Sequence, residues 1–155
     1  MFYAALKTLH LLSIVVWIGG MVFAHFFLRP AVARLDPPQR LPLMRDVLGR
    51  FFAAVLGASL LTLVTGLWMI GRVAKTTVQA GGSFSMPLDW TVMAVLGVLM
   101  VAIFGHIRFV LFKRLRLAVD ASNWPAGGAA LNAIRQWVTA NLAIGIIVIV
   151  VTLLL

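Results

Sequence analysis

Four long apolar segments, separated by short polar connections, dominate the pattern of hydrophobic and polar positions along the chain. Each is close to the length of about 20 residues that a helix needs to cross the hydrocarbon core of a bilayer. Their limits lie at roughly 4–28, 50–71, 88–111 and 134–155. We therefore predict an all-α fold, an integral membrane four-helix bundle that forms a single membrane domain over residues 1–155.

The connection between the first two segments is basic and rich in proline. Proline removes a backbone donor and interrupts a helix, so residues 29–42 are expected to lie at the membrane interface and to form no further spanning helix. The second helix is expected to begin between Met44 and Arg50, outside the lipid core. Residues 76–87 form a small, nearly uncharged connection to the third segment.

Small, polar and aromatic residues recur at helical spacing within the apolar segments, which is typical of the faces that helices turn toward one another in lipid. Asn141 is predicted to point inward, because an amide in lipid needs a hydrogen-bonding partner. The predicted stripes comprise His10, Ser13, Trp17, Gly20, Met21, Ala24, His25 and Leu28 in the first segment, Ser59, Thr62, Thr65, Gly66 and Met69 in the second, and Trp137, Asn141, Gly145 and Thr152 in the fourth.

The composition excludes a soluble protein. Of the 155 residues, 63% are hydrophobic and only 4 are acidic, and a soluble domain of this length has no interior large enough for so much apolar surface. The net charge of +9 comes from basic residues that flank the apolar segments. We attribute it to anionic lipid headgroups and to membrane orientation, with no role in nucleic-acid binding. Cysteine is absent, which excludes disulfides and thiolate metal sites.

Basic residues are distributed unequally between the two sides of the predicted membrane. Of the 13 lysines and arginines, ten belong to the regions around the first and third connections. The positive-inside rule then predicts an N-out/C-out topology with both of these connections in the cytoplasm. We interpret the first segment as a retained helix, because no convincing signal-peptide cleavage motif follows it. The ten residues are Arg29, Arg34, Arg40, Arg45, Arg50, Arg108, Lys113, Arg114, Arg116 and Arg135.

The three histidines carry most of the candidate chemistry. At 1.5 Å per residue, His25 and His106 lie about 25–27 Å from the outer ends of their helices, whereas His10 lies near the outer surface. This predicts an outer metal site, in which His10 is joined by Asp89 and by methionine thioethers. Imidazole and thioether ligands together suit copper, above all the cuprous ion. The candidate thioether ligands are Met69, Met86 and Met93.

An inner site would pair His25 with His106 as metal ligands. Two imidazoles also suit the axial positions of haem iron. Arg29 and Arg108 lie close to these histidines in the sequence, and their guanidinium groups would hold the haem propionates by charge-assisted hydrogen bonds. The ends of the first and third segments also resemble each other, His25 to Arg29 and His106 to Phe109, as in a parallel repeat of two helices per half.

Structural roles remain open for all of these residues. A histidine in a membrane can bridge two helices or reach toward the interface, methionine often fills a core, and Asp89 would stabilise a helix dipole at its position. His106 also points about 100° away from Asp89 on the same helix. No hydrolase or nucleotide-binding motif is present, so an enzyme of this sequence would be a haem-dependent membrane oxidoreductase.

Several short runs resemble the membrane domain of the copper-resistance protein D (CopD) family. The resemblance covers nearly the whole chain and implies a multi-pass protein of the bacterial inner membrane that takes part in copper uptake or resistance. A homo-oligomer, or a redox or copper-carrier partner, is also expected. The runs are Leu9-His10, Trp17-Ile18-Gly19-Gly20-Met21, Arg29-Pro30, Leu63-Val64-Thr65-Gly66-Leu67-Trp68-Met69 and Gly105-His106.

The chain is also similar to the HemJ-type protoporphyrinogen oxidases, four-helix membrane proteins that bind b-type haem. It lacks the lysine expected near Met93 and the acidic residue expected at Leu142, which argues against that oxidation but not against haem. The alternative function is therefore a haem b redox protein with His25 and His106, or His10 and His106, as axial ligands, and a structural or assembly subunit is a further alternative. The similar residues are His10, Trp17, Thr65, Gly66, His106, Ile134, Arg135 and Asn141.

Overall fold

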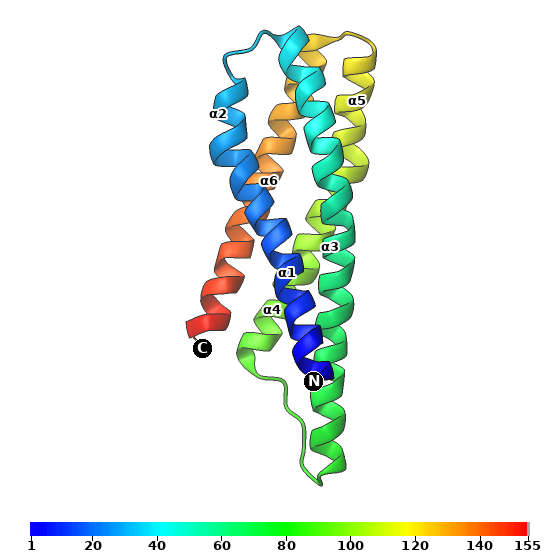
Figure 1. The fold of residues 1–155 in the computed structure, drawn as a ribbon, viewed down its shortest axis with the longest axis vertical. Helices are drawn as coiled ribbons and strands as arrows, with labels where there is room; N and C mark the ends of the chain where they lie inside the picture. The colour runs from blue at the N-terminus through cyan, green and yellow to red at the C-terminus, as the bar shows by residue number, and fades with distance from the viewer. Residues whose placement is uncertain (155) are drawn as a thin grey trace.

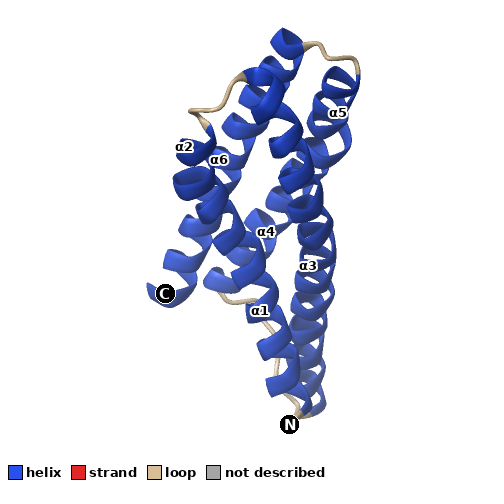
Figure 2. Ribbon diagram, turned by 45° about the horizontal axis from the view of Figure 1, so that its top comes forward, coloured by secondary structure: helices blue, strands red, loops and turns tan. Residues whose placement is uncertain are grey.

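The computed structural model describes residues 1–154 and consists of four long helical rods with short connections (Figure 1). Each rod is long and apolar enough to cross a membrane. No strand is present in the described part of the chain, so the predicted all-α four-helix bundle is confirmed (Figure 2). The rods are α1 (Phe2–Phe23) continued by the π-helical η1 (Ala24–Leu28) and α2 (Arg29–Val32); α3 (Pro37–Gln79); α4 (Leu88–His106) continued by the π-helical η2 (Ile107–Leu111) and α5 (Phe112–Asp120); and α6 (Trp124–Leu154).

The proline-rich connection is more helical than the sequence predicts. The first rod continues through Pro30 to Val32, and α3 begins at Pro37 instead of between positions 44 and 50. Pro37 and Pro38 lie in the first turn of α3, where proline removes no hydrogen bond, because the first backbone donors of a helix have no partner there. Pro42 comes later in the same helix and removes a single bond. The non-helical connection therefore shrinks to residues 33–36.

Helix α3 is much longer than a bilayer requires. Its 43 residues correspond to about 65 Å, roughly twice the thickness of the hydrocarbon core. In Figure 1 its C-terminal end projects past the N-terminus of the chain. The non-helical connection to α4 is correspondingly shorter than predicted and spans residues 80–87.

The four rods pair in the same way in each half of the chain. Helix α1 packs along α3, and α4 packs along α6. Edge-to-face contacts between aromatic rings connect the α1–α3 pair to the pair formed by the α4–α5 rod and α6. The ring centroids are 6.1 Å apart for Trp17 and Phe104, 6.0 Å for Phe52 and Phe104, and 5.4 Å for Phe52 and Phe112. These buried rings form the centre of the hydrophobic core.

Both arginine-rich connections lie at one end of the bundle, and the two termini and the connection from α3 to α4 lie at the other (Figure 1). This arrangement concentrates the basic residues at one end, which we call the basic end. The N-out/C-out orientation itself stays a prediction.

The stripes predicted for the first two segments are their buried faces. The buried residues there include His10, Ser13, Trp17 and Met21 in α1 and Ser59, Thr65 and Met69 in α3. In α6 the prediction was right for Asn141 and Gly145 and wrong for Trp137, which is 42% exposed. The buried face of α6 runs through Ile134 and Val138, and this turns Trp137 away from the core.

Candidate functional site

His10 lies buried between α1 and α3. Its Nδ1 atom is 3.0 Å from the carbonyl oxygen of Thr62 and 3.0 Å from Oγ1 of Thr65. A carbonyl oxygen only accepts, and the Thr65 hydroxyl donates to the Leu61 carbonyl at 2.6 Å. The proton of the neutral ring is therefore on Nδ1, which donates to both groups. The Nε2 atom keeps its lone pair, the state in which a histidine binds a metal.

The sequence of α3 makes room for this ring. A β-carbon at Gly66 would lie 3.2 Å from Cε1 of His10, so the small residue allows the imidazole to approach the helix. Met69 follows one turn later on the same face and is buried. Thr62, Gly66 and Met69 are four and three residues apart, so they lie on one side of α3. That side has the Thr62 carbonyl as a hydrogen-bond acceptor, the free space at Gly66 and the thioether of Met69.

The other residues predicted for the outer site lie on α4. Asp89 is in the first turn of that helix and forms no ion pair or hydrogen bond within residues 1–154, and Met93 is half-buried one turn further on. Helix α4 packs mainly on α6, whereas α1 packs mainly on α3. The structure provides no contact that joins His10 to Asp89 or Met93, and their role as ligands stays a prediction.

The two inner histidines contact α6 on different sides. Nδ1 of His25 is 3.3 Å from Oγ1 of Thr139, and the ring of His106 lies 5.0 Å from that of Trp137. Positions 137 and 139 project about 200° apart around a helix. The geometry therefore gives no support to a single inner site with both imidazoles, either for copper or as axial ligands of haem.

The predicted pair of arginines is divided in the same way. Arg29 lines a pocket together with His25. The guanidinium carbon of Arg108 instead lies 5.8 Å and 5.4 Å from the ring centroids of Phe109 and Phe112, outside that pocket. Arg108 is thus engaged in cation–π contacts.

Both inner histidines coincide with a widened turn of their helix. His25 lies within the π-helical η1, and η2 begins directly after His106. Such turns are rare in helices and often occur at functional sites. The short internal similarity seen in the sequence therefore corresponds to the same local distortion in both halves of the chain.

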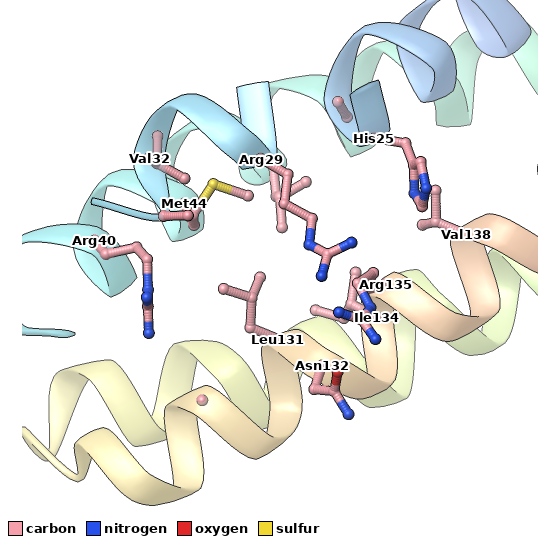
Figure 3. Close-up of a pocket in the computed structure, with 14 residues that line it drawn as sticks. His25, Arg29, Val32, Arg40, Met44, Leu131, Asn132, Ile134, Arg135 and Val138 are labelled. Atoms are coloured by element: carbon pink, nitrogen blue, oxygen red, sulfur yellow. The ribbon is translucent and has the colours of Figure 1, made fainter. Parts of the chain in front are cut away.

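A pocket of about 260 Å³ lies at the basic end, between the end of the first rod, the start of α3 and the N-terminal half of α6 (Figure 3). Arg29, Arg40, Arg135 and His25 line it. The sequence analysis placed His25 and Arg29 in one site, but it did not predict that Arg40 and Arg135 belong to the same site. The available signal was that all three arginines belong to the same basic end of a bundle.

Any metal bound at His10 needs ligands other than a cluster of ionisable side chains. Within residues 1–154, no three His, Cys, Asp or Glu side chains are close enough together to hold an ion. Thioethers, backbone oxygens or water would have to complete the shell. A donor set of one imidazole with thioethers fits a soft ion such as cuprous copper better than a hard one.

Comparison with known proteins finds a match at the level of the family. The family described as copper resistance protein D, CopD, matches residues 45–155. This range begins within α3 and includes Thr65, Gly66 and His106, while His10 and His25 precede it. No curated protein and no solved structure matches the chain.

Proposed function

Because the chain belongs to the copper resistance protein D family, we propose that it handles copper in the membrane, for uptake or resistance, with His10 as its principal copper ligand. The observation that carries this proposal is the hydrogen bond from Nδ1 of His10 to the Thr62 carbonyl. That bond orients the imidazole and leaves Nε2 available. Metal-binding histidines typically donate their other ring N–H in this way, and the partner tunes the affinity of the site.

The distribution of methionine supports a cuprous cargo. Sulfur is a soft ligand that favours this ion, and four methionines are buried in the bundle. Met69 lies one turn from the His10 site and Met44 lies at the basic end, with Met21 and Met100 also in the interior. A copper ion that leaves His10 would therefore meet further soft donors inside the protein.

The test is a competition for cuprous ion between the purified protein and a coloured chelator. Wild type should withdraw copper from the chelator, and His10→Ala should weaken binding by at least about tenfold, since even second-shell changes alter metal affinity by about 10–100-fold. His25→Ala is the matched control, an imidazole in the same rod that is expected to leave the affinity unchanged. Equal binding by wild type and His10→Ala would contradict the proposal.

The absorption spectrum separates copper from the alternatives. A Soret band that shifts on reduction with dithionite would identify a haem protein and reject the copper assignment. A colourless protein that binds no cuprous ion would instead favour a structural or assembly role. The expected result is a colourless protein that binds cuprous ion.

A further inference from the structure

The pocket at the basic end brings three guanidinium groups together from three separate segments. Arg29 comes from α2, Arg40 from α3 and Arg135 from α6, and Figure 3 shows them around one cavity with the ring of His25 nearby. The cavity has a volume of about 260 Å³. Each of the three arginine side chains is partly shielded from solvent.

No counter-charge accompanies these arginines in the described chain. The ion pairs found within residues 1–154 join Arg45 to Asp46 and to Asp120, and no acidic residue lines the pocket. Among the described residues, the Nε atom of Arg40 is buried without a hydrogen-bond partner. Like charges repel more strongly where water is partly excluded, and an unsatisfied buried donor costs free energy. An anion in the pocket would reduce the repulsion among the three arginines and would accept a hydrogen bond from Nε of Arg40.

The helix that carries Arg135 also holds the imidazole in place. Thr139 donates its hydroxyl hydrogen to the Arg135 carbonyl at 2.8 Å, and its oxygen lies 3.3 Å from Nδ1 of His25. Since that hydrogen is already used, Nδ1–H of His25 is the donor to Thr139. The planar fork of each guanidinium matches the oxygens of a phosphate group, which arginine binds through two parallel hydrogen bonds.

The remainder of the lining is apolar. Met44, Leu48, Leu131 and Val138 form part of the wall, so the cavity offers a cationic part and a hydrocarbon part. It also lies at the basic end of the bundle, and anionic headgroups are attracted to basic residues at a membrane surface. We propose that this pocket binds the phosphate group of an anionic phospholipid, with the glycerol and upper acyl chain against the apolar wall. Basic pockets between membrane helices suit such headgroups.

The test compares two triple variants that lose the same charge at the same end of the bundle. R29Q/R40Q/R135Q removes the pocket arginines, and R34Q/R114Q/R116Q removes three exposed arginines outside the pocket. The proteins are purified with phosphatidylglycerol, and the retained lipid is counted by native mass spectrometry. Wild type and the exposed-arginine control should retain this lipid, whereas the pocket variant should retain at least about tenfold less. An equal loss in both variants would overturn the proposal.

A steric variant tests the same pocket without changing its charge. Gly128 lines the pocket, and a β-carbon there meets nothing within 4 Å, so Gly128→Leu should fold and block the cavity. Leucine also favours a helix more than glycine does. We expect the same loss of phosphatidylglycerol as in the pocket triple variant, and full retention would contradict the site. Binding of inorganic phosphate that depends on the pocket arginines, without lipid retention, would reject the lipid as the source of the phosphate.

Discussion

The imidazole of His10 lies directly against Gly66, so that a β-carbon at position 66 would be 3.2 Å from Cε1 and 3.6 Å from Nδ1 of the ring. Few real contacts of a β-carbon are this short. The absence of a side chain on α3 is therefore what lets the ring reach the Thr62 carbonyl. The orientation of the proposed copper ligand depends on a residue that has no side chain of its own.

Substitution of Gly66 by valine should displace this ring. We expect Gly66→Val to lower the affinity for cuprous ion several-fold, because the histidine loses its bond to Thr62, and to destabilise the fold by about 1–3 kcal/mol through overpacking. Copper competition and thermal unfolding in detergent measure the two effects. Gly57→Val is the matched control on the same helix, because a β-carbon at Gly57 meets nothing within 4 Å. Equal behaviour of the two variants would refute the role assigned to Gly66.

Two adjacent glycines in α1 provide a sharper test of the packing. A β-carbon at Gly20 would collide with the ring of Phe51 on α3, whereas one at Gly19 meets nothing within 4 Å. Gly20→Ala should therefore destabilise the protein by about 1–3 kcal/mol. Gly19→Ala should be neutral or stabilising by up to about 1 kcal/mol, because alanine favours the helix. Thermal unfolding of the two variants checks the difference, and a Gly20→Ala protein as stable as Gly19→Ala would contradict this packing.

The fold was predictable because lipid imposes a simple rule. A backbone in hydrocarbon must satisfy its own hydrogen bonds, so four apolar segments of sufficient length imply four helices. The buried stripes followed from small and polar residues at helical spacing, as at Ser59 and Thr65. The rule failed at the ends of the helices. Proline in a first turn lengthens a helix instead of breaking it, and Pro37 shows this.

The site was less predictable, because it depends on how helices rotate and pair. Depth along the membrane placed His25 and His106 at one level, but depth does not fix the direction in which a side chain points. The two rings contact α6 through Thr139 and Trp137, on different sides. A π-helical turn also adds a residue to its turn and rotates the remainder of the helix, and no pattern of residues indicated η1 in advance.

The orientation in the membrane can be measured directly, since the chain contains no cysteine. Single cysteines at Ser83, in the connection from α3 to α4, and at Ala121, after α5, probe the two ends of the bundle. Both positions are exposed. The concentration of arginine at the basic end predicts that this end faces the cytoplasm. In intact cells a membrane-impermeant maleimide should therefore label Ser83→Cys and should label Ala121→Cys only after lysis. The reverse pattern would establish the opposite topology.

Asn141 is a polar residue whose side chain is fully buried in the bundle. Its side chain is 1% exposed, and neither Oδ1 nor Nδ2 has a hydrogen-bond partner within the described residues. A buried amide without partners costs about 1–3 kcal/mol, whereas leucine has a similar size and no polar atom. Asn141→Leu should therefore stabilise the metal-free protein by an amount in this range, measured as a higher midpoint of thermal unfolding.

The control for this effect is Asn132→Leu on the same helix. Asn132 is exposed, so its replacement removes no desolvation cost and should change the midpoint little. A midpoint for Asn141→Leu below that of wild type would mean that the amide has a partner, such as a buried water. If the variant is more stable but binds cuprous ion less tightly, then Asn141 contributes to copper binding and lowers the stability of the fold. Buried polar groups that persist in a core at such a cost are typical of functional sites.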